Sequence, residues 1–215
     1  TLPGPPVGFR LPDHRPLAHL ATGDRVASTS SPGLLKIGAS LVFTSPFTPM
    51  LFMGEEWGAQ TPWQFFSDHE GELGEAVRRG RRAEFASHGW ATEDVPDPQA
   101  LSTFEASRLD WSELTGDSAQ DLLAFTRDLI GLRRSRPELT DGRRDRIAIT
   151  YDEDSRWLVV RRGGIAVACN LSPERQIVPL PGTPTAVLLT SAPGFVFRDG
   201  EVDLDAESVA VLDLV

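Results

Sequence analysis

The sequence predicts the end of an α/β barrel followed by a small antiparallel β-sandwich domain. The first observation is an apolar run at residues 49–53 that leads into Gly54, Glu55, Glu56 and Trp57. Parallel barrel strands are covered on both faces and therefore read as continuous apolar runs, and functional groups gather where they end. The second observation is the alternation of short β-type runs with glycine and proline turns over residues 143–215.

Composition restricts the classes of partner. The chain has 215 residues, of which 40% are hydrophobic and 24% charged, as in globular proteins. A formal net charge of −10 argues against nucleic acid and membrane partners, which recruit basic patches. We find no leader and no apolar run long enough to span a membrane, and Cys169 is the only cysteine. We therefore expect a cytoplasmic protein with a neutral or cationic ligand, no intrachain disulfide, no metal ion and no cofactor.

The N-terminal part predicts one helix and one strand. Residues 1–16 are rich in proline and lack an apolar period, so we expect them to be irregular. Ser31 and Pro32 supply an N-cap and a proline at the first helical position, which predicts a helix over residues 32–43. Prolines then end this helix, and residues 49–53 form the predicted buried strand.

The remainder predicts an aromatic loop, two more helices and a β domain. Residues 54–116 are too long and too aromatic for a simple connection. A helix is expected at 72–86, with its arginine-rich run on a solvated face. An amphipathic helix begins at Asp117 or Ser118 and ends at Pro137. The short β-type runs beyond it are 147–150, 157–161, 165–168, 185–189 and 208–214.

Several segments carry a resemblance to a known family. They are Ser31-Pro-Gly-Leu-Leu-Lys-Ile-Gly, Thr44-Ser-Pro-Phe-Thr-Pro-Met-Leu-Phe-Met-Gly-Glu-Glu-Trp-Gly-Ala, Asp94-Val-Pro-Asp-Pro-Gln, Thr103-Phe-Glu and Leu109-Asp-Trp. On these residues the chain resembles the C-terminal part of the α-amylase family of glycoside hydrolases, in particular its trehalose-releasing members. The resemblance covers residues 21–215 and is most specific over 31–111.

The resemblance implies an incomplete barrel. It implies a divergent or irregular segment at 1–30, the end of a (β/α)8 glycosidase barrel at 31–140 and a C-terminal β domain at 143–215. Within the barrel end, residues 49–53 would be the eighth strand and 117–135 the eighth helix. An eight-stranded barrel needs about 250 residues. The family's nucleophile and acid/base lie on the fourth and fifth strands, which this chain lacks, so we expect a fragment that is inactive alone and whose partner is the missing barrel portion.

The two adjacent glutamates are candidate substrate-binding residues. Retaining hydrolysis of a glycosidic bond needs two carboxyl groups about 5–5.5 Å apart. Glu55 and Glu56 are consecutive, so their side chains diverge on an extended segment and do not form such a pair. We expect one of them to line a sugar site while the loop holds the other. The alternative is that both cap loop amides or pair with arginines.

The loop also supplies candidate aromatic and amide contacts to sugar. Trp57, Trp63, Phe65 and Phe66 can stack on the apolar faces of pyranose rings. Gln64 lies between them, where a group that binds hydroxyls is needed. The alternative is that these aromatic side chains form the core of the loop.

The acid that stabilises the transition state in this family is missing from its expected position. Alignment of residues 21–25 with the family places Asp13, His14, Arg15 and Pro16 on an Asn-His-Asp-Gln motif. His14 matches and is a candidate substrate-binding residue, whereas Arg15 occupies the acid position. A cation there would oppose the positive charge that develops on the sugar. The chain therefore contains no complete catalytic set.

Three functional hypotheses follow. The first is a glycoside hydrolase of α-amylase type that cleaves the α-1,4-glucosidic bond next to the trehalose unit of maltooligosyltrehalose, with this chain a fragment of it. The second is a non-catalytic carbohydrate-binding remnant. The third is a fragment of a glucan branching enzyme. All three imply maltooligosyltrehalose or another α-glucan oligosaccharide as the ligand.

Overall fold

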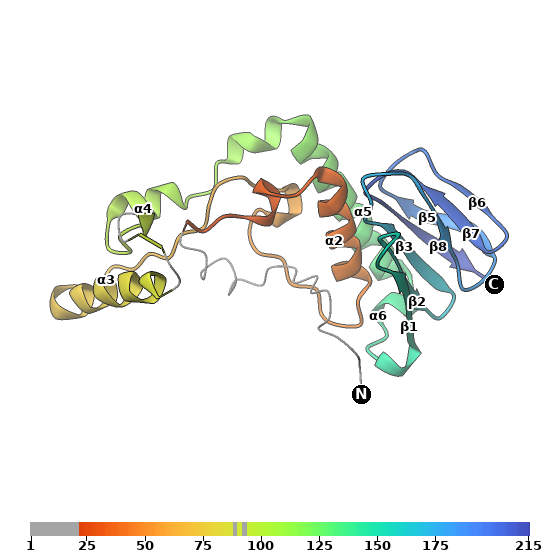
Figure 1. Cartoon of the computed structure of the whole chain (residues 1–215), viewed down its shortest axis with the longest axis horizontal. Coiled ribbons are helices and arrows are strands. Elements are labelled where there is room, and N and C mark those ends of the chain that lie inside the picture. The colour runs from red at the N-terminus through yellow and green to blue at the C-terminus, as the bar shows by residue number, and fades with distance from the viewer. Residues whose placement is uncertain (1–21, 88–89, 92–93) are drawn as a thin grey trace. The chain divides into compact units, whose positions relative to one another are not determined.

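The computed structural model describes residues 22–87, 90–91 and 94–215 (Figure 1). The chain divides into two compact units. One contains the described residues up to Thr29 together with Leu51–Gly116, and the other contains Ser30–Met50 and Asp117–Val215. The predictions for residues 1–16 lie outside the described residues.

The second unit contains two antiparallel sheets, which confirms the predicted β-sandwich. The larger sheet has the order β1-β2-β3-β8-β5 and the smaller one the order β4-β7-β6. Each predicted β-type run lies within a strand. The strands are β1 (Ile147–Asp152), β2 (Trp157–Arg162), β3 (Ile165–Asn170), β4 (Gln176–Pro179), β5 (Pro184–Thr190), β6 (Val196–Arg198), β7 (Glu201–Leu204) and β8 (Ser208–Leu214).

Strand β3 lies between two apolar cores. All six of its residues are buried. Ala166 and Ala168 belong to the core between the two sheets, together with residues such as Val202. Val167 and Cys169 belong to a second core, between the larger sheet and the helices. Because both faces of β3 are covered, its sequence is a continuous apolar run rather than an alternating one.

Helices α2 (Pro32–Thr44) and α5 (Asp117–Ser135) pack against each other and against the larger sheet (Figure 1). Both confirm helices predicted from the sequence. The predicted N-cap is also present, because Ser31 Oγ accepts a hydrogen bond from the backbone N–H of Leu34 at 3.2 Å. An ion pair of 2.6 Å between Lys36 Nζ and Asp121 Oδ2 joins the two helices. The short helix α6 (Pro137–Thr140) follows α5.

Two arginines bind the carbonyl groups at the C-terminal end of α2. Arg133 Nη1 donates to the carbonyls of Phe43 and Ser45, at 2.6 and 2.8 Å. Arg162 Nη1 donates to those of Thr44 and Ser45, at 2.7 and 2.9 Å. The last carbonyls of a helix have no intrahelical partner and carry partial negative charge, so the two guanidinium groups satisfy them and complement the helix dipole.

The described residues of the first unit form helices and loops. Its helical elements are η1 (Val26–Ser28), η2 (Glu55–Trp57), α3 (Gly71–Ala86), α4 (Leu101–Ala106) and η4 (Trp111–Thr115). Helix α3 confirms the helix predicted at 72–86. None of the described helices of the chain is long and apolar enough to cross a membrane.

The predicted buried strand at 49–53 is wrong for this structure. These residues have no strand assignment, and Met50 and Met53 are 65% and 42% exposed. A barrel strand is held by hydrogen bonds to neighbouring strands and is covered on both faces. None of the described strands pairs with this segment. The apolar run predicted a buried segment, but the described residues leave Met50 and Met53 exposed.

The expected solvated face of the arginine run is also wrong at one position, Arg81. The Arg81 side chain is 9% exposed, and its guanidinium lies over the rings of Phe65 and Phe85, at 5.2 and 4.3 Å from their centroids. Arg78 Nε donates to both carboxylate oxygens of Asp97, at 3.1 and 3.0 Å. A run of charges in the sequence does not show which members have aromatic or acidic neighbours from distant segments.

Candidate functional site

The turn that carries the predicted site residues is fixed by two glycines. Gly54 and Gly58 flank η2 and have φ angles of 89° and 74°, in the left-handed region that favours glycine. The backbone N–H of Ala59 donates to the carbonyl of Gly54 at 2.8 Å and closes the turn. A Cβ atom on Gly54 would lie 2.6 Å from Ala59 Cβ. Glycine is therefore required at position 54 by both conformation and space.

Both glutamates of the turn hold backbone amides. Glu55 Oε2 accepts from the N–H of Phe52, and Glu56 Oε2 accepts from the N–H of Gly54, each at 2.9 Å. Both side chains are half-buried. The amide caps that the sequence offered as an alternative are thus present. Sugar binding by one of the two stays a prediction.

Arg25 joins the segments on either side of the turn. It is 4% exposed. Its Nη1 donates to the carbonyl of Met53 at 2.8 Å, its Nε donates to the carbonyl of Thr61, and its guanidinium lies 5.4 Å from the ring centroid of Phe52. Burial lowers the pKa of Arg25, while the nearby carboxylates of Glu55 and Glu113 act in the opposite direction. Sequence analysis did not identify this residue, because a single arginine gives no signal of its distant partners.

The environment of Glu55 makes the turn sensitive to pH. Burial raises the pKa of Glu55, while the hydrogen bond from Phe52 and the charge of Arg25 act in the opposite direction. Its Oε1 is buried and has no hydrogen-bond partner among the described residues. A carboxyl whose pKa is higher in the folded state favours folding at pH values below its unfolded pKa. That contribution is lost as the pH rises through the folded value.

We therefore expect the Glu55→Gln variant to lose part of the pH dependence of unfolding. In the unmodified chain, the free energy of unfolding should contain a component that decreases as the pH rises through the range above the ordinary glutamate pKa. The variant should lack this component, because glutamine does not titrate. Urea unfolding followed by tryptophan fluorescence at several pH values measures it. The matched control is Glu105→Gln on the exposed face of α4, which should leave the pH profile unchanged. An identical profile for Glu55→Gln and the unmodified chain would contradict the expectation.

The structure brings Trp63 and Phe66 together in an aromatic row. The row runs through Phe52, Trp63, Phe66 and Phe104, with successive ring centroids 5.1, 5.4 and 5.2 Å apart in edge-to-face geometry. Phe65 is 40% exposed and lies beside Arg81 instead. Phe52, Trp63 and Phe66 are only half-buried and Phe104 is 42% exposed, so the contact of Trp63 and Phe66 with sugar stays a prediction.

Trp57 lies apart from this row and contacts another tryptophan. Its side chain is 4% exposed, and its ring centroid is 5.1 Å from that of Trp111, with the planes inclined at 39°. Trp111 is 65% exposed, although sequence analysis did not assign it to the site. Its only signal was its place in the Leu109-Asp110-Trp111 segment of the resemblance. The predicted residue Gln64 is half-buried, and its backbone N–H donates to Ser107 Oγ at 3.1 Å.

Glu113 fixes η4 to the loop that follows the turn. Its Oε2 accepts from the N–H of Gln60 at 3.0 Å. Its Oε1 accepts from the N–H and the hydroxyl of Thr61, at 3.2 and 3.0 Å. Both oxygens are thus used to hold one short segment, which gives Glu113 a structural role that the sequence did not indicate.

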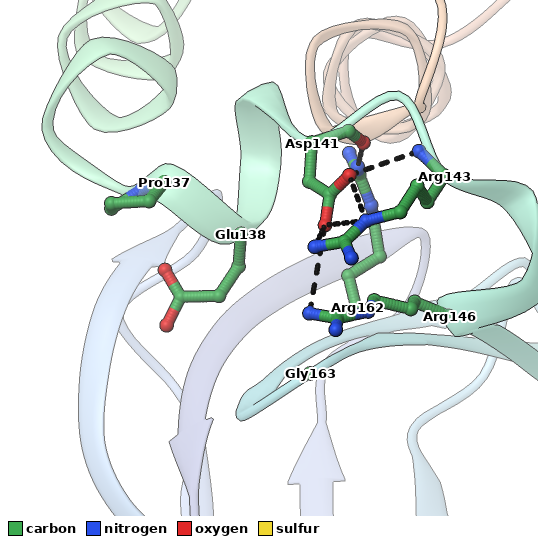
Figure 2. Close-up of a pocket in the computed structure, with 7 residues that line it drawn as sticks. All are labelled: Pro137, Glu138, Asp141, Arg143, Arg146, Arg162 and Gly163. Carbon is green, nitrogen blue, oxygen red and sulfur yellow. Dashed lines mark hydrogen bonds and ion pairs between the residues drawn. The ribbon is translucent and has the colours of Figure 1, made fainter.

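The second unit contains a small pocket of about 190 Å³ in which the charged groups bind one another (Figure 2). Figure 2 shows Arg143 and Arg146 converging on the carboxylate of Asp141, with Oδ2 at 2.7 Å from Arg143 Nη2 and 3.7 Å from Arg146 Nη1. These contacts lower the pKa of Asp141 to about 2, with the hydrogen bond from the Arg143 side chain as the largest cause. Arg162 donates to the backbone carbonyl of Asp141. We assign this pocket a structural role.

The predicted positions His14 and Arg15 lie outside the described residues. The proposal that His14 contacts substrate and that Arg15 replaces the transition-state acid therefore stays a prediction.

The chain is similar to curated enzymes over nearly all of its length. It is 44% identical over 200 residues to malto-oligosyltrehalose trehalohydrolase of Mycobacterium tuberculosis (strain CDC 1551 / Oshkosh), which covers 93% of this chain and 34% of that protein. It is 45% identical over 202 residues to the enzyme of the same name from Rhizobium sp. (strain M-11), with 93% and 33% covered. The chain thus spans about a third of the length of the curated relatives it matches.

A domain family and solved structures give further similarities. Residues 142–211 match the family described as a domain of unknown function (DUF3459). A crystal structure from Salmonella typhimurium, assigned as an alpha amylase, has 33% identity and a TM-score of 0.76 and covers 94% of this chain and 34% of that one. The trehalulose synthase of Pseudomonas mesoacidophila MX-45 has a TM-score of 0.57 at 16% identity over 85% of this chain and 38% of that one, a likeness of fold alone.

Proposed function

Because this chain belongs with the malto-oligosyltrehalose trehalohydrolases of the α-amylase family, we propose that it forms one wall of an α-glucan site and lacks the groups that cleave the bond. In the complete enzyme, the bond cleaved would be the α-1,4-glucosidic bond next to the trehalose unit of maltooligosyltrehalose. The observation that carries the proposal is the turn at Gly54–Gly58, which holds two carboxylates and a tryptophan beside an exposed aromatic ring. The expected ligand is maltooligosyltrehalose or another maltooligosaccharide.

The residues of the turn have roles in binding rather than in bond cleavage. Glu55 and Glu56 each hold a loop amide with one oxygen. Carboxylate oxygens can also accept hydrogen bonds from sugar hydroxyls, and this contact breaks no covalent bond. A retaining hydrolase needs in addition a nucleophile and an acid positioned on opposite sides of the bond. We propose that these two groups belong to the part of the relatives' length that this chain does not span, which would also supply neighbours for residues 49–53.

One observation favours the hydrolase over the branching enzyme. The names of the curated relatives refer to trehalose release rather than to glucan branching. The hydrogen-bonded turn and its exposed aromatic neighbour also predict that the chain itself binds glucan. The same binding is expected of a carbohydrate-binding remnant. The hydrolase fragment and the binding remnant therefore predict the same behaviour for the isolated chain and differ only in what completes it.

The test is a titration of the 215-residue chain with maltoheptaose, followed by isothermal calorimetry and by tryptophan fluorescence. We expect saturable binding, because the aromatic and carboxylate groups of the turn are held in place before the ligand arrives. Cellohexaose is the control ligand, since its β-linked chain has a different shape and should bind more weakly. A folded sample that binds neither oligosaccharide would contradict the proposal.

A further inference from the structure

The exposed ring of Trp111 contacts the buried ring of Trp57. Tryptophan side chains are highly buried on average. Trp111 is 65% exposed, whereas Trp57, which it contacts, is 4% exposed. The centroid distance of 5.1 Å and the inclination of 39° place the two rings in direct contact. Trp57 therefore supports the outer ring from one side.

Two carboxylates fix the short helix that carries Trp111. Asp110 Oδ1 accepts from the N–H and the hydroxyl of Ser112, at 2.9 and 2.6 Å, and so caps the start of η4. Glu113, two residues after Trp111, binds Gln60 and Thr61 through both of its oxygens. The backbone on either side of the ring is thus held by hydrogen bonds. A ring held in this way loses little conformational freedom when a ligand stacks on it, which favours affinity.

Asp110, the residue before Trp111, carries a hydrogen-bond acceptor. The hydrogen bonds from Ser112 lower the pKa of Asp110, so the carboxylate is charged at neutral pH. Among the hydrogen bonds of the described residues, Asp110 uses Oδ1 to cap η4. An aromatic ring and a charged acceptor on consecutive residues suit a sugar ring, which has an apolar C–H face and hydroxyl groups at its edge.

We propose that Trp111 stacks on a pyranose ring of the bound α-glucan, with Asp110 accepting a hydrogen bond from one of its hydroxyls. Trp57 is then a positioning residue that supports Trp111 from below rather than a direct sugar contact. This inference rests on the proposed function, because it names a binding residue of the same site. It changes the assignment of the aromatic contact from the buried Trp57 to the exposed Trp111.

The test compares Trp111→Ala with Trp111→Phe in maltoheptaose titrations of the full chain. Loss of the ring should weaken binding by about tenfold, which corresponds to about 1.4 kcal/mol of stacking energy. Phenylalanine keeps an aromatic face, so Trp111→Phe should retain most of the affinity. Tyr151→Ala removes a side chain that is 62% exposed on β1, in the other unit, and should leave binding unchanged.

A second measurement does not depend on variants. In the unmodified chain, saturating maltoheptaose should protect the Trp111 indole from oxidation by N-bromosuccinimide, as located by peptide mass spectrometry. Two results would overturn this inference and leave the proposed function intact. One is that Trp111→Ala binds maltoheptaose as tightly as the unmodified chain does. The other is that the unmodified chain binds maltoheptaose without protection of Trp111. A folded chain that binds no maltoheptaose would overturn both.

Discussion

Replacing Arg162 by methionine should lower the free energy of unfolding of its unit by at least about 3 kcal/mol. The Arg162 side chain is 3% exposed, and burial, its largest influence, lowers its pKa. Its guanidinium donates to four backbone carbonyls, those of Thr44, Ser45, Leu139 and Asp141. Of these four carbonyls, only that of Ser45 also accepts a hydrogen bond from Arg133. The variant leaves the other carbonyls without this donor, and each buried unsatisfied group costs about 1–3 kcal/mol.

Arg146→Met is the matched control for this prediction. Arg146 lines the same pocket, but its side chain is 59% exposed and its ion pair with Asp141 is 3.7 Å long. An exposed pair of this kind contributes about 0–1 kcal/mol. Urea unfolding followed by far-ultraviolet circular dichroism compares the two variants. Equal stability of Arg162→Met and Arg146→Met would contradict the role assigned to Arg162.

Replacing Gly54 by alanine should destabilise the turn by at least about 2 kcal/mol. The left-handed conformation costs a residue with a Cβ about 1–2 kcal/mol. The new methyl group would also lie 2.6 Å from Ala59 Cβ and 3.0 Å from Leu109 Cδ2, so the packing around it must shift, which typically costs a further 1–3 kcal/mol, roughly. We expect a change in near-ultraviolet circular dichroism, because Trp57 and Trp111 lose their fixed contact, and faster proteolysis in the loop.

Gly80→Ala serves as the control for Gly54→Ala. Gly80 lies inside α3, and among the described residues no atom outside its chain neighbours and its own stretch of helix backbone is within 4 Å of the position of its added Cβ. Alanine is the better helix former by about 1 kcal/mol, so this variant should be as stable as the unmodified chain or more stable. If both variants behave alike, the conformation and crowding at Gly54 do not control the turn.

The parts of the fold that the sequence predicted are those determined by local pattern. Ser31 and Pro32 predict the start of α2 because an N-cap and a first-turn proline act within a few residues. The strands of the β domain follow from short apolar runs between turn residues in the same way. Residues 49–53 also have such a pattern, but a strand needs neighbouring strands, and none of the described ones pairs with them. An apolar run indicates only that a segment is suited to burial.

Only those parts of the candidate site that depend on local pattern were predicted from the sequence. The turn and its glutamates could be located, because glycine, carboxylates and tryptophan are adjacent in the sequence. The partners of Arg25, Arg81 and Glu113 come from segments far along the chain, and no spacing rule predicts them. The exchange of roles between Trp57 and Trp111 depends on which of the two rings is buried. That difference is a property of the folded loop and is absent from the order of residues.

Trehalose release and glucan binding, measured in one sample of the 215-residue chain, test the proposed function most directly. The chain is incubated with maltooligosyltrehalose, bound ligand is measured by calorimetry and free trehalose by chromatography. We expect binding without release of trehalose, because the residues of the described turn that we propose to bind sugar do not include a nucleophile and acid pair. Release of trehalose by the purified chain alone, and its loss in Trp111→Ala, would contradict the claim that this chain is a binding wall without catalytic groups.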